Sequence, residues 1–305
     1  MSYNILVIDG GGVKGLYSAQ ILLRCFKEYP ELINNIDALA GASTGAIIAA
    51  AIAAKVAPEQ IVDLYRSNLK KIFKDSYWDD IKDLGKLIGA DYDYANLKSV
   101  LKKYFGSKKL GDLEKKILIP AFDLDNESTP RTWKPKFYNN YQDTDLEELV
   151  VDALIKGAAA PTYFPSYQGY VDGGFAANSP CISAVAQALD TKTGQQKLED
   201  INLLSIGPGF SPTFVSGKKL DWGVSQWAPL LIDIFFDCMK FTTEYQCSRL
   251  LGDKYHRIDS IFNEKVALDN VGILDNLIDY ANKEDLSETF KWLEKYWKNS
   301  NKSEN

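Results

Sequence analysis

The chain has 305 residues, of which 46% are hydrophobic and 25% charged, and its formal net charge at pH 7 is −6. These proportions are ordinary for a globular protein with a sizeable core. The net negative charge argues against sequence-independent binding to a nucleic acid polymer, which needs a basic face. The four cysteines lack C-x-x-C spacing and the chain has one histidine, which argues against a Cys/His zinc site. We therefore expect neither a metal nor a cofactor.

The beginning of the sequence does not resemble a secretory leader. No basic segment precedes an apolar core with a small-residue cleavage site. The apolar run around residues 46–57 is shorter than the roughly 20 residues that a membrane-spanning helix needs. We expect a cytoplasmic protein, with peripheral membrane contact as a further hypothesis.

The N-terminal part of the chain alternates strands with helices. The apolar run 5–8 leads through the glycine-rich segment 9–15 into a helical pattern. A second apolar strand at 37–40 precedes the alanine-rich helix 46–54. Two consecutive strand–loop–helix units predict a right-handed parallel α/β arrangement. We expect a three-layer fold with a mostly parallel central sheet flanked by helices.

The remaining segments are predicted to extend this one domain. They are, in order, helices 60–73 and 96–105, strands 117–122 and 131–138, helix 146–158, strand 203–206, and helices 227–251 and 275–297. Residues 76–94, rich in Asp, Tyr and Gly, predict an exposed loop or lid. We find no internal repeat or linker, which favours a single domain over residues 1–297 with a disordered tail at 298–305.

The G-x-S-x-G stretch at residues 41–45 suggests a nucleophilic serine. It lies between a predicted strand and a predicted helix, the context in which a serine is held on a strained corner. Gly41 and Gly45 allow close approach of the backbone to neighbouring elements. The competing interpretation is that Ser43 is only a helix N-cap, because serine is favoured there.

The glycine-rich loop Gly10-Gly11-Gly12-Val13-Lys14-Gly15 allows several interpretations. Its G-x-G-x-x-G spacing fits a dinucleotide-binding loop, but the next strand does not end in the acidic residue that would hold the ribose. A Walker loop is excluded by spacing. Alternatively, consecutive glycines expose N–H groups that form an oxyanion hole, with Lys14 adding positive potential.

A serine nucleophile needs a proton acceptor, and the candidates are few. The single histidine, His256, lies among charged neighbours late in the chain, where a packing role is favoured over a catalytic one. Asp172 ends a short apolar stretch and is followed by Gly173 and Gly174. A carboxylate can act as the base if burial raises its pKa, so Asp172 is the better candidate, although an ordinary Asx turn also fits.

Four motifs in order, at residues 9–15, 41–45, 158–165 and 172–174, together resemble the patatin-like phospholipase family. The resemblance extends from about residue 5 to residue 258. It implies a Ser-Asp dyad acyl hydrolase without a catalytic histidine or a calcium requirement. Carried onto this chain, it implies that Ser43 is the nucleophile and Asp172 the base, and that Gly10, Gly11, Gly12 and Lys14 form the oxyanion-hole loop. Lys14 stands where the family often has arginine.

The resemblance implies a phospholipase A-type lipid acyl hydrolase that acts on a glycerolipid or phospholipid at a membrane or micelle interface. Trp78, Trp133, Trp222 and Trp227 are candidates for contact with that interface. Some members of the family are switched on by a partner or a nucleotide signal, so an effector that needs an activator is one alternative. The others are an esterase that uses His256, a nicotinamide-binding protein, and a storage or signalling protein that merely keeps the fold.

Overall fold

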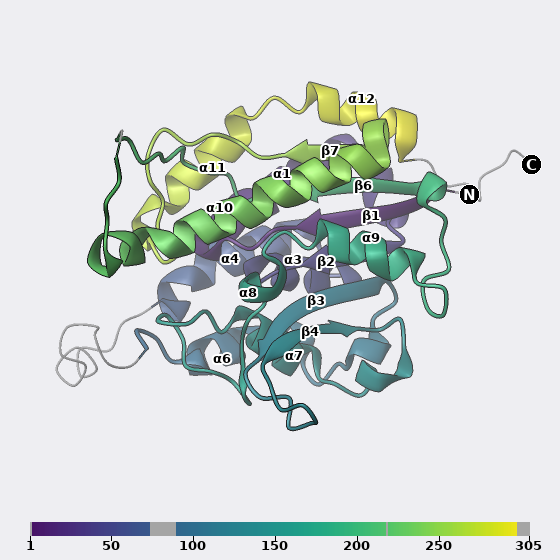
Figure 1. Ribbon diagram of the computed structural model, residues 1–305. Helices are drawn as coiled ribbons and strands as arrows, with labels where there is room; N and C mark the ends of the chain where they lie inside the picture. Colours follow the sequence, from purple (N-terminus) through teal and green to yellow (C-terminus); the bar gives the residue numbers. More distant parts are fainter. Residues whose placement is uncertain (1, 74–89, 218, 298–305) are drawn as a thin grey trace, which may run out of the picture.

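The computed structural model describes residues 2–73, 90–217 and 219–297, in which a central sheet lies between two layers of helices (Figure 1). The strands are β1 (Tyr3–Ile8), β2 (Ala38–Gly41), β3 (Lys116–Asp123), β4 (Lys134–Asn139), β5 (Tyr170–Asp172), β6 (Ile201–Ile206) and β7 (Tyr255–Ile258). The helices are α1 (Gly15–Glu28), α2 (Glu31–Asn34), α3 (Thr44–Ala53), α4 (Pro58–Ile72), α6 (Tyr94–Phe105), α7 (Val150–Ala158), α8 (Gly174–Ala177), α9 (Cys181–Leu189), α10 (Val224–Leu251), α11 (Leu274–Lys283) and α12 (Ser287–Tyr296).

The sheet is mostly parallel. Its strand order is β4-β3-β2-β1-β6-β7, and every neighbouring pair from β3 to β7 along this order is parallel. Only β4 and β5 run antiparallel, both against β3. The predicted three-layer α/β fold with a mostly parallel sheet is therefore confirmed.

Strand β5 occupies a position that decides the geometry of the site. The first half of β3 pairs with β2, in the register Ala38↔Lys116 to Ala40↔Leu118. Its last residues pair with β5, in the register Ala121↔Asp172 to Asp123↔Tyr170. The end of β5 therefore lies beside β3 just beyond the point where β2 stops.

The two faces of the sheet pack against different helices. On β1, Leu6 and Ile8 belong to the core cluster that contains residues of α1, α3, α4, α7 and α11. Ile5 and Val7 point to the other face, where the core contains residues of α9 and the C-terminal part of α10. Because successive strand residues alternate between faces, the continuous apolar run predicted at 5–8 serves both cores.

Two predictions about helices need correction. The segment predicted as one helix over 275–297 consists of α11 and α12, separated at 284–286. Asp285 Oδ1 accepts a hydrogen bond from the N–H of Ser287 at 2.9 Å, which favours a new helix start over continuation of the first helix. Helix α9 was not predicted, although Cys181, Val185 and Ala188 have the spacing of a buried helical face.

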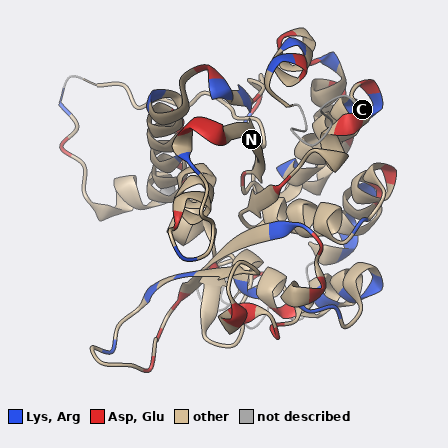
Figure 2. Cartoon of the chain, turned by 90° about the vertical axis from the view of Figure 1, so that its right-hand side faces the viewer, with Lys and Arg blue, Asp and Glu red and all other residues tan. Residues whose placement is uncertain are grey.

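Three expectations fall partly or wholly outside the described residues: most of the loop or lid predicted at 76–94, Trp78, and the tail at 298–305. The end of that predicted loop is described, and Asp93 there caps α6 by accepting a hydrogen bond from the N–H of Ala95 at 2.8 Å. Within the described ranges, no helix is both long and apolar enough to cross a bilayer. On the side of the molecule shown in Figure 2, acidic and basic residues are interspersed along the helices.

Candidate active site

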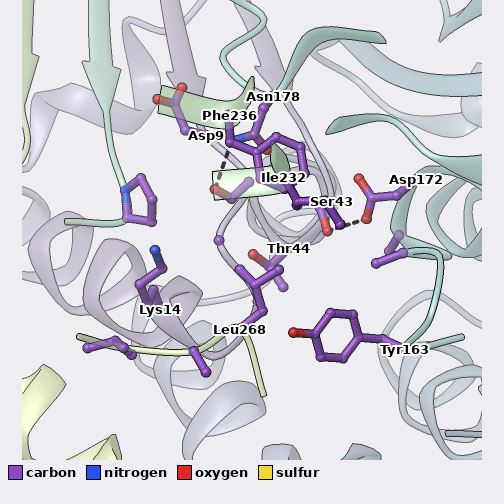
Figure 3. A pocket seen from close by; sticks show the side chains of 18 of the residues that line it. Asp9, Lys14, Ser43, Thr44, Tyr163, Asp172, Asn178, Ile232, Phe236 and Leu268 are labelled. Carbon is purple, nitrogen blue, oxygen red and sulfur yellow. Dashed lines mark hydrogen bonds between the residues drawn. The ribbon is translucent and has the colours of Figure 1, made fainter. Parts of the chain in front are cut away.

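Ser43 occupies a strained corner between β2 and α3. Its φ is 51° and its ψ is −123°, a region that residues with a side chain rarely adopt. Strain of this kind persists where the surrounding structure enforces it, and it is common at functional sites. The corner holds the serine side chain at the wall of a cavity (Figure 3).

The two glycines that flank Ser43 are required by close backbone contacts. A Cβ atom on Gly41 would lie 2.3 Å from the carbonyl oxygen of Gly45. A Cβ atom on Gly45 would lie 2.2 Å from the carbonyl oxygen of Ile8, in the neighbouring strand β1. Any larger residue at either position would push α3 away from the sheet and move the serine with it.

Asp172 is hydrogen-bonded to Ser43. Ser43 Oγ donates to Asp172 Oδ2 at 2.7 Å (Figure 3), and the N–H of Gly174 donates to Asp172 Oδ1 at 2.6 Å. The Asp172 side chain is buried, and burial raises its pKa from 3.8 to about 6, although the two hydrogen bonds oppose this rise. Gly173 lies against β3, because a Cβ atom there would be 2.0 Å from the carbonyl oxygen of Pro120.

The glycine loop that follows β1 presents N–H groups to the same cavity. The N–H of Gly10 donates a hydrogen bond to the carbonyl oxygen of Asn178 at 3.0 Å. The N–H of Val13 donates to the carbonyl oxygen of Leu268 at 2.7 Å. Among the residues that the structure describes, no backbone acceptor engages the N–H groups of Gly11 and Gly12. These two groups, rather than the N–H of Gly10, are therefore free to meet an oxyanion.

The Lys14 side chain lines this cavity, and Figure 3 shows it on the opposite side of the view from Asp172. Burial lowers the pKa of Lys14. Its own backbone N–H closes the turn by donating to the carbonyl oxygen of Gly11 at 3.1 Å.

A buried ionic cluster fixes the start of the glycine loop. Arg257 Nη2 donates to Asp9 Oδ2 at 2.8 Å and to Asp259 Oδ2 at 2.9 Å, and Arg257 Nη1 donates to Ser205 Oγ at 2.7 Å. Asp259 Oδ1 in turn accepts a hydrogen bond from the N–H of Gly209 at 2.8 Å. The guanidinium thus ties the loop after β1 to the turn after β6, and sequence reasoning had assigned it no role.

The cavity has a volume of about 400 Å³ and two chemically different sides. One side, which we call the apolar side, comes mainly from α3, α4, α6 and the segment after α7; its residues are Ile47, Leu64, Leu69, Ile72, Leu97 and Phe164. The other, the charged side, comes from the glycine loop, α10 and the segment after β7; its charged residues are Asp9, Lys14, Asp233, Asp237, Lys240 and Lys265. Ser43 and Asp172 also line the cavity.

His256 packs against α12, away from the cavity. Its Nε2 is 2.9 Å from Thr289 Oγ1, and its ring stacks on Trp292 with 5.4 Å between centroids. It does not belong to the residues that line the cavity. Burial lowers the pKa of His256, as expected for an imidazole packed between β7 and α12.

The structure also shows what sequence reasoning missed. Asn178 was given no role from the sequence, and Lys240 was not singled out at all. The sequence signal that could have identified Lys240 and Arg257 is a charge inside an apolar segment. Lys240 follows Cys238-Met239 and precedes Phe241, and Arg257 lies beside Ile258. Among the described residues, no cluster of three or more His, Cys, Asp or Glu side chains could hold a metal ion.

The chain is similar to several known proteins. A family model described as patatin-like phospholipase matches residues 6–185. Protein teg of Priestia megaterium is 28% identical, over 97% of this chain and 99% of that protein. The cGAMP-activated phospholipase of Pseudomonas aeruginosa is 29% identical, over 85% of this chain and 78% of that protein. Among solved structures, VipD from Legionella pneumophila aligns with 97% of this chain and 67% of its own, at 13% identity and a TM-score of 0.43.

The raised pKa of Asp172 predicts an effect on stability. Between pH 3.8 and about 6 the folded chain binds more protons at Asp172 than the unfolded chain does, so stability from this group falls as the pH rises through that window. We expect Asp172→Asn to be more stable than wild type above pH 6, by up to about 3 kcal/mol, and to show little gain below pH 4. Urea unfolding at pH 4 and pH 8 measures the difference.

The matched control for that experiment is Asp275→Asn. This variant removes a carboxylate whose side chain is 91% exposed. We expect its free energy of unfolding to stay within about 0.5 kcal/mol of wild type at both pH values. A gain for Asp172→Asn that is equal at pH 4 and pH 8 would contradict the assignment of the shift to burial of the carboxylate.

Proposed function

The chain belongs to the patatin-like phospholipase family, and we propose that it is a phospholipase A-type acyl hydrolase in which Ser43 and Asp172 form the catalytic dyad. The observation that carries this proposal is the 2.7 Å hydrogen bond from Ser43 Oγ to the buried Asp172 carboxylate, at the wall of a cavity with one apolar side. No other described residue contacts the Ser43 hydroxyl through a hydrogen bond.

The proposed reaction begins when Ser43 Oγ attacks the carbonyl carbon of an acyl ester and Asp172 accepts the hydroxyl proton. A carboxylate can take this proton because burial has raised its pKa towards neutrality. The negative charge that develops on the carbonyl oxygen is met by the N–H groups of Gly11 and Gly12 and by the positive end of α3. The alcohol leaves with the proton from Asp172.

The acyl-enzyme is then hydrolysed by water. Asp172 accepts a proton from the attacking water, the tetrahedral intermediate again places its charge on the glycine loop, and the fatty acid leaves as Ser43 recovers its proton. The apolar side of the cavity supports this substrate class, since aliphatic and aromatic side chains from α3, α4 and α6 form a surface suited to an acyl chain.

Gating by a nucleotide signal remains the main alternative. It rests on the name of one relative, the cGAMP-activated phospholipase, which is 29% identical to this chain. Fatty-acid release is therefore measured with and without cGAMP. Full hydrolysis in its absence would contradict an obligatory requirement for that nucleotide.

Substitutions at the dyad provide the direct test. We expect Ser43→Ala and Asp172→Ala to lower fatty-acid release from mixed phospholipid vesicles by about 10³-fold or more, because each removes a group that forms or breaks bonds. His256→Ala should keep most of the activity, since His256 packs against Thr289 and Trp292. The converse result, with loss of activity only in the histidine variant, would replace the dyad by a Ser-His mechanism.

The activity should depend on pH through the Asp172 carboxylate. The base works only when ionised, so kcat/KM should fall as the pH decreases through about 6, and by roughly tenfold for each further pH unit. Initial rates between pH 4.5 and 8 on an uncharged ester substrate give the profile. A rate that stays constant over this interval would be inconsistent with a buried aspartate as the base.

The tryptophans are not the strongest candidates for membrane contact. Trp133 is 69% exposed, but Trp222 and Trp227 are half-buried and pack on each other with 5.2 Å between ring centroids. Trp78 lies outside the described residues. The first half of α10 and the segment before it instead expose Phe214, Val224, Leu231, Ile232, Ile234 and Phe235, which we call the α10 surface.

We propose that the α10 surface meets the lipid interface. Exposed apolar side chains are concentrated on the helix that also contributes Ile232 and Phe236 to the cavity lining. An apolar surface continuous with the cavity lets a lipid leave the bilayer without crossing water.

Charge on this surface should weaken vesicle binding. We expect the double variant Leu231→Glu/Ile234→Glu to bind zwitterionic vesicles about tenfold or more weakly, because two carboxylates must be dehydrated at the interface. Leu250→Glu is the matched control, since Leu250 is 51% exposed at the other end of the same helix. Co-sedimentation measures binding, and equal loss in both proteins would show that the effect is not specific to the α10 surface.

A further inference from the structure

Lys240 is a buried cation that has no hydrogen-bond partner in the part of the chain that the structure describes. Its side chain is 7% exposed and lines the cavity, and its Nζ has no acceptor within hydrogen-bond distance among the described residues. The nearest carboxylate oxygens are Asp259 Oδ2 at 3.6 Å and Asp237 Oδ1 at 4.0 Å. The ammonium also lies 3.6 Å from the centroid of the Phe210 ring. A buried ammonium with unused donors is costly, so an anion that accepts from it would be bound favourably.

A second ammonium, that of Lys14, faces the same side of the cavity. Burial lowers the pKa of Lys14, and the positive charge of Lys240 lowers it further, whereas Asp259 opposes both effects. The two like charges are therefore close enough to repel each other. An anion between them would relieve this repulsion and accept the unused N–H donors.

Most of the neighbouring carboxylates already have closer cationic partners. Asp9 and Asp259 share the Arg257 guanidinium at 2.8 and 2.9 Å, and Asp233 pairs with Lys265 at 2.8 Å. Among the residues that the structure describes, these pairs leave Lys14 and Lys240 as the positive charges of the cavity that lack an equally close partner. The charged side of the cavity thus has donors available for an anionic ligand.

We propose that Lys240, together with Lys14, binds the phosphate diester of a phospholipid substrate, which makes this side of the cavity a head-group subsite. The inference rests on the proposed lipid hydrolase function. With an acyl chain on the apolar side and its ester carbonyl at Ser43, the phosphate meets the charged side of the same cavity, where both lysines lie. A phosphate diester carries one negative charge and two non-bridging oxygens, and each ammonium can donate to one of them.

The experiment compares two lipids that differ only in the phosphate head group. Phosphatidylcholine and diacylglycerol with identical acyl chains are presented in the same uncharged detergent micelles, and kcat/KM is measured for each. We expect Lys240→Met to lower kcat/KM for phosphatidylcholine by about 10- to 100-fold, and to change that for diacylglycerol much less. Lys240→Arg, which keeps the charge, should retain the preference for the phospholipid.

Lys156→Met controls for loss of a buried lysine. Lys156 is as buried as Lys240, but its Nζ donates to Glu148 Oε1 at 2.8 Å and it does not line the cavity. This variant should leave the ratio of the two kcat/KM values unchanged, even if stability falls. An equal decrease for both lipids in Lys240→Met, or no decrease for phosphatidylcholine, would overturn the proposed subsite.

A binding measurement separates this proposal from the catalytic one. Dihexanoylphosphatidylcholine, which is soluble as a monomer, is titrated calorimetrically into Ser43→Ala and into Ser43→Ala/Lys240→Met. Weaker binding to the double variant supports the subsite even if the wild-type chain hydrolyses neither lipid. Equal binding of the lipid to both proteins overturns the proposed subsite. Binding of inorganic phosphate as tightly as the lipid also overturns it, because the subsite would then serve a free anion.

Discussion

The site depends on a carboxylate that is buried without a cation in hydrogen-bond contact. Asp172 is compensated by one backbone N–H, from Gly174, and by the Ser43 hydroxyl. A carboxylate that is stabilised by so few donors is a strong proton acceptor. Its burial destabilises the charged form and thereby raises its pKa towards neutrality. The proposed reactivity of Ser43 and the predicted cost of Asp172 to stability therefore have one physical origin.

This arrangement is achieved by strand pairing. Strand β2 is short and stops at Gly41, whereas β3 continues to Asp123, and β5 pairs with the part of β3 that β2 leaves free. The serine follows the end of one strand and the aspartate ends the other, so the sheet itself brings together two residues 129 positions apart. The glycine loop after β1 completes the site at the carboxyl ends of the parallel strands, where α/β sheets commonly bind ligands.

The sequence predicted the local geometry around Ser43 better than the surroundings of the site. Ser43 and the glycines around it could be identified from the sequence because a strained turn needs particular residues at fixed spacing. That requirement is local to a few neighbouring residues. The antiparallel placement of β5 could not be predicted, because it depends on the different lengths of β2 and β3. Arg257 and Lys240 were missed for a related reason: a single charge in an apolar segment does not reveal whether it reaches solvent or turns inward. The break between α11 and α12 was foreseeable only from Asp285, a weak signal within a continuous helical pattern.

Helix α10 is attached to the molecule differently from the helices of the apolar side. The helices of the apolar side belong to the core cluster that also holds α1 and α3, whereas α10 joins the opposite core through Cys247 and Leu251 near its far end. Substitutions in the first half of α10 can therefore alter the lining of the cavity while Ser43, Asp172 and the glycine loop stay in place. Such a division allows proteins with the same Ser-Asp pair and glycine loop to diverge in the ligand they bind through one helix alone.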